Sequence, residues 1–395
     1  MSTIADKLQE LINSKADMKS AIAEKGVEVE GGLTTYAAAI RKIQQGSGDR
    51  FAAIGYNAEN TGGFIQLMDA DIEVSKKILD EWNREGGHID MNKWKNVTVY
   101  FPAVDLTMGP SYAPHFSFSG WTKLQVVPSL DFTGSTSMYD LFRKCKSLKY
   151  IGNITGVENV TDTNYMFDGC SSLNTIPQMD TSSVSSMNYM FRDCASLTTI
   201  PQLDTSSATN LGGMFQGCSS LTTIPELDTS SATNLGRMFQ GCSSLTSIPQ
   251  LNTSSVLSME GMFQYCTSLT TIPQLSTSNV TEMGSMFTNC ESLTSIPLLD
   301  CSSITDATAP FVFSSNLYNL TDLGGFKNLK VNWNMGFLNM IANLTVESLM
   351  NVINNLYDLT ANGLSGQTLS FGNMNLNKLT DEQIAVAIAK GWTLI

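Results

Sequence analysis

The sequence has little charge, little histidine and no long apolar run. Charged residues make up 15 % of its 395 residues, against roughly 25 % in an average globular protein. With two histidines, neither in a nucleophile-activating motif, we expect no enzyme, no metal and no cofactor. No stretch approaches the roughly 18 apolar residues of a membrane span, so we expect no membrane insertion. The opening "MSTIADKLQELINSK" lacks the charged and apolar regions of a general secretory signal.

Basic residues are scarce over most of the chain. The net charge is -13, and Arg192 and Arg237 are the only basic residues between Ile151 and Ala309. A nucleic-acid partner requires a row of lysines or arginines that neutralises phosphates. The sequence therefore argues against nucleic acid as a partner.

The sequence contains a repeat of 24 residues. Phenylalanine recurs at this interval, with one interval of 25, and the ladder is Phe118, Phe142, Phe167, Phe191, Phe215, Phe239, Phe263, Phe287 and Phe311. Cysteine follows three residues later at Cys145, Cys170, Cys194, Cys218, Cys242, Cys266 and Cys290. Self-similarity at this period predicts a solenoid, in which stacked coils share one apolar core.

The pattern within a coil predicts its local structure. We expect "SLTTIPEL" to be extended and to pair with its copies above and below at about 4.8 Å per coil, with the proline ending the strand. "SATNLGRMFQGC" predicts a single helical turn or a short 3₁₀ piece. The predicted fold class is an α/β solenoid, a leucine-rich-repeat-like right-handed coil, whose core ladder includes Phe191, Phe215, Phe239, Phe263, Cys194, Cys218, Cys242 and Cys266.

The cysteines have three possible roles. Because they occupy one position per coil and no CxxC occurs, we expect buried thiols that behave as small apolar groups. Oxidised pairs and a metal site are the alternatives. Cys301 lies outside the cysteine register, and we expect its thiol to be accessible.

The periodicity divides the chain into four parts. Residues 1–45 predict a helical hairpin for anchoring and oligomerisation, 46–97 a linker and N-terminal cap with a helix at about 71–83, 98–327 the solenoid, and 328–395 a strand–helix cap. In the cap, Thr345 begins one helix, and Thr380 with Gln383 forms a capping box before another. The apolar stripe expected to drive oligomerisation is Ile4, Leu8, Leu11, Ile12, Met18 and Ile22.

Two groups of residues are candidates for binding. The first consists of rows expected on the exposed face: Thr198, Thr222, Thr246, Thr270, Gln202, Glu226 and Gln250. Threonine is also an ordinary exposed strand residue, so these rows have a purely structural explanation. The second group comprises positions that stacking does not require, namely Arg192, Arg237 and Tyr265. The cluster Arg143, Lys144 and Lys146 is also irregular, although a solvated charge run explains it as well.

Two resemblances bear on function. The motif "MF-x-C-x-SLT-IP-L-TS" resembles the BspA-type leucine-rich repeats of bacterial surface proteins over about residues 98–395. The closing "LTVESLMNVINNL" and "LTDEQIAVAIAKGWTLI" are similar to the C-terminal cap of such proteins in gut Bacteroides-type bacteria and their phages. The segment "KADMKSAIAEKGVEVEGGLTTYAAAIRKI" resembles an N-terminal module of phage tail and fibre proteins.

Together these resemblances imply a virion appendage. The N-terminal module would join other virion proteins, a homo-oligomer is expected with a trimer favoured, and the solenoid would project outward to bind a host-surface glycan or protein. The expected location is the virion, assembled in the host cytoplasm. The alternatives are a purely architectural virion protein and a BspA-like surface adhesin exported by another route.

Overall fold

The computed structural model describes residues 117–127, 130–304, 317–331 and 341–395, together with the backbone of four strands nearer the N-terminus. Two of these strands, β1 (Ala52–Tyr56) and β2 (Gly62–Gln66), form an antiparallel pair. The other two are β3 (Val99–Tyr100) and β4 (Leu106–Thr107). The predicted hairpin of residues 1–45 with its apolar stripe and the predicted helix at 71–83 lie outside the described residues.

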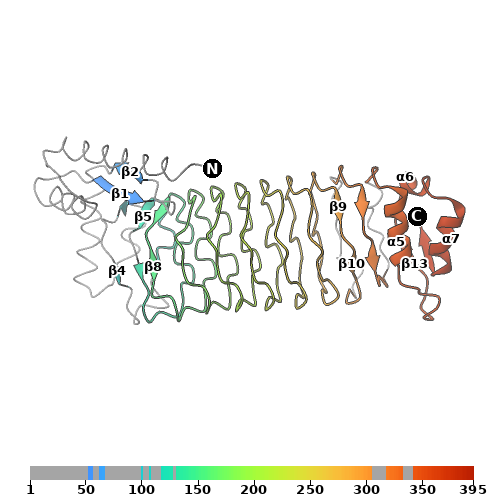
Figure 1. Ribbon diagram of the computed structural model, residues 1–395, viewed down its shortest axis with the longest axis horizontal. Helices are drawn as coiled ribbons and strands as arrows, with labels where there is room; N and C mark the ends of the chain where they lie inside the picture. Colours follow the sequence, from blue (N-terminus) through green and yellow to red (C-terminus); the bar gives the residue numbers. More distant parts are fainter. Residues whose placement is uncertain are drawn as a thin grey trace, which may run out of the picture.

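The 24-residue repeats form coils that lie side by side along the long axis of the molecule (Figure 1). Neighbouring coils are parallel, because equivalent residues one coil apart are bridged through their backbones. These parallel bridges join Ser137, Asp162, Ser186, Asn210, Asn234, Ser258 and Glu282 in sequence. The period read from the sequence is therefore the period of the stack.

Regular strands occur in the first and last coils, and all of them pair in parallel. β5 (Leu124–Val127) lies between β3 and β7 (Tyr150–Ile151), and β6 (Leu130–Asp131) lies between β4 and β8 (Ile154–Thr155). Towards the C-terminus, β9 (Ser295–Ile296) pairs with β11 (Asp322–Leu323), and β10 (Leu299–Asp300) pairs with β12 (Phe326–Lys327).

In the middle coils the densest hydrogen-bond ladder lies in the segment around the phenylalanine, which we had predicted to be helical. The N–H groups of Tyr189, Phe191 and Asp193 donate to the next coil, at 2.9, 2.9 and 2.6 Å. The intervening N–H groups of Met190 and Arg192 donate three residues back within the coil. The segment is thus a run of turns, and the helical prediction was wrong.

The predicted strand "SLTTIPEL" carries fewer bonds in these coils. Thr294 N–H donates to the Thr270 carbonyl oxygen at 3.0 Å, but proline follows the aliphatic residue of the segment, as at Pro201 and Pro225. Because proline has no N–H group, it ends the ladder there. The stack relies on the turn segment instead.

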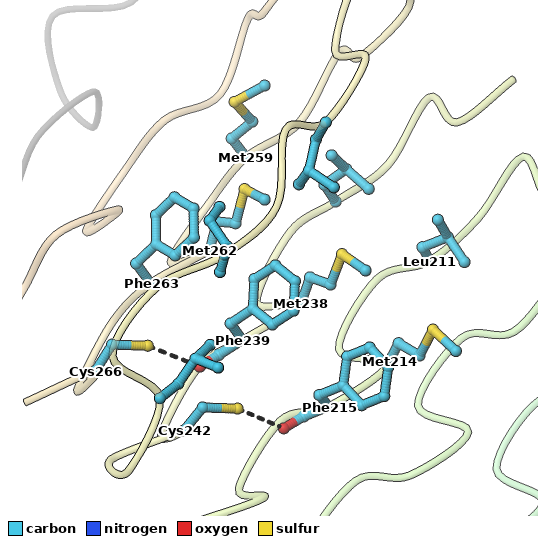
Figure 2. Packing of buried hydrophobic residues seen from close by; sticks show 14 of the residues in the cluster. Leu211, Met214, Phe215, Met238, Phe239, Cys242, Met259, Met262, Phe263 and Cys266 are labelled. Atoms are coloured by element: carbon cyan, nitrogen blue, oxygen red, sulfur yellow. Dashed lines mark hydrogen bonds between the residues drawn. The ribbon is translucent and has the colours of Figure 1, made fainter. Parts of the chain in front are cut away.

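The core consists of columns of identical side chains. Successive phenylalanine rings from Phe118 to Phe287 lie 5.4–5.9 Å apart between centroids, with planes within 8° of parallel. Each ladder cysteine donates its S–H to the phenylalanine carbonyl of the preceding coil, as Cys242 does to Phe215 at 3.1 Å and Cys266 to Phe239 at 3.0 Å (Figure 2). These rings and thiols are fully buried, and all eight cysteines are free thiols.

Cys301 is buried as well, contrary to our expectation. Its exposed fraction is 1 %, and burial raises the pKa of its thiol to about 12. The reason lies in the register, since Cys301 stands 24 residues after Thr277 and occupies the buried threonine position of its coil. Thus "DCS" replaces the "DTS" of earlier coils, and the side chain points inward.

The C-terminal segment contains helices and a short sheet. α5 (Val346–Asn355) packs against β11 and β12, and the Thr345 side chain caps its first turn. α6 (Asn373–Leu376), which the sequence did not predict, precedes α7 (Asp381–Ala389), where Thr380 and Gln383 form the predicted capping box. β13 (Gln367–Leu369) pairs in parallel with β14 (Trp392–Leu394).

None of the helices in the described ranges is both long and apolar enough to cross a bilayer.

Candidate functional site

A shallow trough runs across five coils at the corner where each coil carries Gln-Leu-Asp-Thr-Ser or a close variant. One hollow of about 630 Å³ is lined by Leu227, Asp228, Thr229, Gln250, Leu251, Asn252, Thr253, Gln274, Leu275 and Ser276. A second of about 530 Å³ is lined by Gln178, Met179, Asp180, Thr181, Gln202, Leu203, Asp204, Thr205, Ser206 and Asp228. Asp228 lines both, so the two hollows form one surface, which we call the corner trough.

The floor of the trough is rigid. Its leucines, such as Leu203 and Leu251, are buried core residues. Buried threonines beside them tie neighbouring coils together, since the Thr229 hydroxyl donates to the Asn252 carbonyl oxygen at 2.8 Å and that of Thr253 to Ser276 at 2.8 Å. The floor therefore keeps its shape without a ligand.

The glutamines of the trough also join coils. Gln202 donates its amide N–H to the carbonyl oxygen of Glu226 at 2.6 Å, and Gln250 donates to that of Gln274 at 2.8 Å. The amide nitrogens are therefore used in hydrogen bonds between neighbouring coils. The amide oxygens of the glutamine row remain as acceptors for a ligand. The trough thus presents mainly acceptors.

Carboxylates add negative charge to one wall. In each of Asp180, Asp204 and Asp228, Oδ1 accepts the N–H of the serine two residues later, at 2.9–3.0 Å. The serine N–H and hydroxyl bonds lower the pKa of Asp180 and Asp228, so both are ionised at neutral pH. Asn252 makes the same turn, accepting from Ser254 N–H at 3.2 Å. The turn therefore requires an acceptor and not a charge.

The predicted threonine row lies outside the trough. The row consists of exposed residues, namely Thr198, Thr222, Thr246 and Thr270. Hydroxyl groups of this row donate hydrogen bonds to backbone carbonyls of the preceding coil. Thr222 donates to the Thr198 carbonyl oxygen at 3.4 Å, and Thr270 donates to that of Thr246 at 3.2 Å. The two predicted rows are separate, and only the glutamine row reaches the trough, through Gln202 and Gln250.

The irregular candidates lie in the turn segment around the phenylalanines, and none lines the trough. Arg192 pairs with Asp168 at 2.7 Å, and Arg237 pairs with Glu260 at 2.7 Å. Tyr265 is 48 % exposed and has a positive φ of 63°. These three residues form no common site with the threonine and glutamine rows.

Sequence reasoning missed two features of this surface. Asp204 and Asp228 line the trough and were not among the predicted binding residues, although Asn252 at the equivalent position shows that the turn does not require a charge. Sequence reasoning also passed over Asp168, which is buried between two arginines. Within the described ranges, no group of histidine, cysteine, aspartate and glutamate is arranged to hold a metal ion.

One known family model matches part of the repeat region. Residues 136–244 and 219–321 match the family described as "Mycoplasma protein of unknown function, DUF285". Both matched spans lie within the repeat region. The match supports the BspA-like part of the resemblance, and it does not extend to the segment that resembles a phage module. No match is found among curated proteins.

Among solved structures, similarity is low. A leucine-rich repeat protein of T. pallidum (TpLRR) is 19 % identical, with 50 % of this chain and 78 % of that chain covered and a TM-score of 0.27. One from Eubacterium ventriosum is 15 % identical, with 64 % and 90 % covered and a TM-score of 0.26. The functional domain of InlJ from Listeria monocytogenes, described as including a cysteine ladder, is 13 % identical, with 64 % and 70 % covered and a TM-score of 0.19.

Proposed function

We propose that this leucine-rich-repeat-type protein is a bacteriophage tail or fibre appendage whose coils bind a glycan or protein of the host surface through the corner trough. The observation that carries the binding role is the trough itself, a hollowed surface of leucine, glutamine, aspartate and threonine side chains that is repeated over five coils. The virion location rests on the resemblance of the N-terminal segment to a phage module. Other virion proteins would hold that segment, and a homo-oligomer, with a trimer favoured, would present several troughs at once.

The chemistry of the trough favours a ligand rich in hydrogen-bond donors. Glutamine oxygens and ionised aspartates face it, while the glutamine amide nitrogens are engaged in stacking. Hydroxyl groups of a sugar or N–H groups of a peptide complement such a surface. Bonds to ionised acceptors are about twice as strong as neutral ones, so the aspartates should dominate the affinity.

The decisive variant is Asp180→Asn/Asp204→Asn/Asp228→Asn. Asparagine keeps the turn acceptor, as Asn252 does, and the aspartates are exposed, so the melting temperature should fall only slightly. Affinity for host cells should fall by about tenfold or more, because bonds to charged groups contribute ~1.5–3 kcal/mol each. Fluorescently labelled full-length protein on intact host cells, measured by flow cytometry, gives the readout.

A matched control removes the same charge elsewhere. Glu158, Glu282 and Glu291 are exposed and lie outside the trough, so their triple change to glutamine should leave cell labelling intact. Equal labelling by the aspartate variant and the wild type would refute the trough as the binding site. Wild-type protein that labels no cells would favour the architectural alternative.

Location is tested separately. Mass spectrometry of purified virions should detect the chain at a stoichiometry typical of tail or fibre proteins. Detection in the bacterial envelope and not in virions would establish the adhesin alternative, which has the same BspA-like resemblance in its favour.

A further inference from the structure

A second surface, distinct from the trough, is built from aromatic and guanidinium groups. Tyr139, Tyr165 and Tyr189 form a column with ring centroids 5.8 and 5.2 Å apart. Arg143 lies over the Tyr165 ring at 4.9 Å, and Arg192 lies over that of Tyr189 at 4.8 Å. We call these five residues the tyrosine–arginine strip.

A buried carboxylate holds both arginines in place. Asp168, 2 % exposed, accepts from Arg143 Nε at 2.9 Å and from Arg192 Nε and Nη2 at 2.7 and 2.8 Å. The arginine side chains remain 31 % and 27 % exposed. Arg192 also lies 3.9 Å from the exposed carboxylate of Asp193. The two arginines thus share the buried Asp168 and present ordered, partly exposed guanidinium groups at the surface.

Stacking of the coils does not require the strip. At the position of Tyr165 and Tyr189, later coils carry Gly213, Arg237, Gly261 and Ser285, with the same positive φ. At the position of Arg143, Asp168 and Arg192, the later coils carry glutamines that bond to one another, Gln216 to Gln240 and Gln240 to Gln264. The coils therefore stack without tyrosine at the first position and without an arginine–aspartate cluster at the second.

The tyrosines also carry a backbone cost. Tyr165 and Tyr189 adopt φ of 58° and 56°, a left-handed conformation that costs a residue other than glycine about 1–2 kcal/mol. Arg237 and Ser285 adopt the same positive φ one and three coils after Gly213, so the conformation belongs to the repeat. What distinguishes Tyr165 and Tyr189 is the ring that each presents. Tyrosine and arginine are also the side chains that dominate binding hot spots.

Charge identifies the class of partner. Residues 117–151 contain five basic residues, Lys123, Arg143, Lys144, Lys146 and Lys149, against two acidic ones. Residues 152–304 contain two basic and twelve acidic residues. The strip is therefore at the basic end of an otherwise acidic stack. An anionic ligand short enough to stay at this end fits, whereas a long nucleic acid would meet the acidic coils.

We propose that the tyrosine–arginine strip binds a short acidic oligosaccharide, such as the end of an acidic glycan, whose carboxylates pair with Arg143 and Arg192 and whose sugar rings pack against the tyrosines. Lys144 and Lys146, both exposed next to the strip, add to the attraction. Guanidinium groups suit carboxylates because the two pair through parallel N–H···O bonds. This inference is independent of the trough, whose acceptors repel an anion.

Two variants replace residues of the strip by the residues that later coils carry at the same positions. The glycine variant, Tyr165→Gly/Tyr189→Gly, removes the rings and leaves the ion cluster. The glutamine variant, Arg143→Gln/Asp168→Gln/Arg192→Gln, extends the glutamine column. The control Ser285→Gly tests glycine at the same coil position and a φ of 58° outside the strip. Binding of the full-length protein to short alginate oligosaccharides, which carry uronate carboxylates, is measured by biolayer interferometry, with neutral dextran oligosaccharides and a short thymidine oligonucleotide as comparison probes.

We expect wild-type protein and Ser285→Gly to bind alginate, more weakly as salt rises, and not dextran. Both strip variants should melt near the wild-type temperature and bind alginate about tenfold or more weakly. Absence of wild-type binding to alginate, or unchanged binding in the glycine variant, overturns the proposal. Preference for the oligonucleotide overturns it in favour of nucleic acid. If the glycine variant does not fold, the strip is structural and the proposal fails.

Discussion

At the scale of single residues, the cysteine column shows how one small side chain meets two demands. Each thiol fills the space beside a phenylalanine and donates its S–H to a backbone carbonyl of the preceding coil, at 3.0–3.1 Å. Each of these carbonyls also accepts a backbone N–H group of its own coil, as Phe215 does from Cys218 at 3.1 Å, so the thiol supplies the second bond. An alanine would leave a void and remove that second bond.

The thiols should make the protein sensitive to alkali. Burial raises the pKa of every one of the eight thiols, to about 12 for Cys290 and Cys301. The native state then binds more protons than the unfolded state above the unfolded thiol pKa. The contribution of the buried thiols to the free energy of unfolding is fully present below about pH 8.5. As the pH rises towards 12, each thiol lowers the free energy of unfolding by about 1.4 kcal/mol per pH unit.

Denaturant unfolding at several pH values measures this slope. Cys242→Ala should be less stable at neutral pH, and its free energy of unfolding should fall less steeply with pH than that of the wild type. Equal slopes in the two proteins would show that the buried thiols do not govern alkaline unfolding.

At the scale of structural elements, the turn segment around each phenylalanine holds the stack together. It alternates N–H groups directed to the next coil with N–H groups directed within the coil, and positive φ values at Tyr189 and Asp193 accompany this alternation. Gly213 and Gly217 occupy the same positions one coil later, with φ of 60° and 75°. A left-handed conformation is therefore built into the repeat, whichever residue is present.

Gly213 has an additional constraint, because the Tyr189 ring covers it. A Cβ atom at Gly213 would overlap that ring, whereas one at Gly241 would meet only the Gly217 backbone at 3.5 Å. Both substitutions to alanine incur the left-handed cost of about 1–2 kcal/mol. Gly213→Ala should destabilise the protein by a further ~1–3 kcal/mol through overpacking.

Thermal or denaturant unfolding of Gly213→Ala and Gly241→Ala tests this difference. Adding Tyr189→Gly to Gly213→Ala should recover the extra loss, since the clash needs both side chains. A double variant no more stable than Gly213→Ala would rule out the ring as its cause.

At the scale of the whole molecule, the described coils behave as a one-dimensional stack. Each coil contacts its neighbours through the same ladder, the same phenylalanine rings and the same thiol bonds. Stability in such an array is close to a sum of coil and interface contributions. No coil in the middle is therefore essential to the fold.

Deletion of residues 215–238 tests this independence. It removes one period and rejoins Met214 to Phe239, equivalent to the natural pair Met214–Phe215. The shortened protein should fold with a modestly lower melting temperature and a maximum dimension about 5 Å smaller by small-angle X-ray scattering. Deletion of residues 215–226, about half a coil, should prevent cooperative folding. Equal stability of the two deletions would contradict the stacked-coil description.

Much of the fold was predictable from periodicity, whereas the local bonding was not. The spacing of Phe191, Phe215 and Phe239 predicts a shared column, because a residue repeated at the coil period must lie in the same place in every coil. The helical prediction for the turn segment failed because apolar spacing near 3–4 residues also suits a run of turns. Cys301 was misassigned because it was compared with the other cysteines and not with Thr277.

The sequence alone determined the period, the identity of the buried columns and the starts of the helices at Thr345 and Thr380, since each depends on residues close together or at the coil interval. Tertiary structure alone decided which segment carries the ladder, where the trough lies and how Arg143, Asp168 and Arg192 meet. These features depend on side chains and backbone groups of different coils, and their relative placement is set by hydrogen bonds between residues about one coil apart.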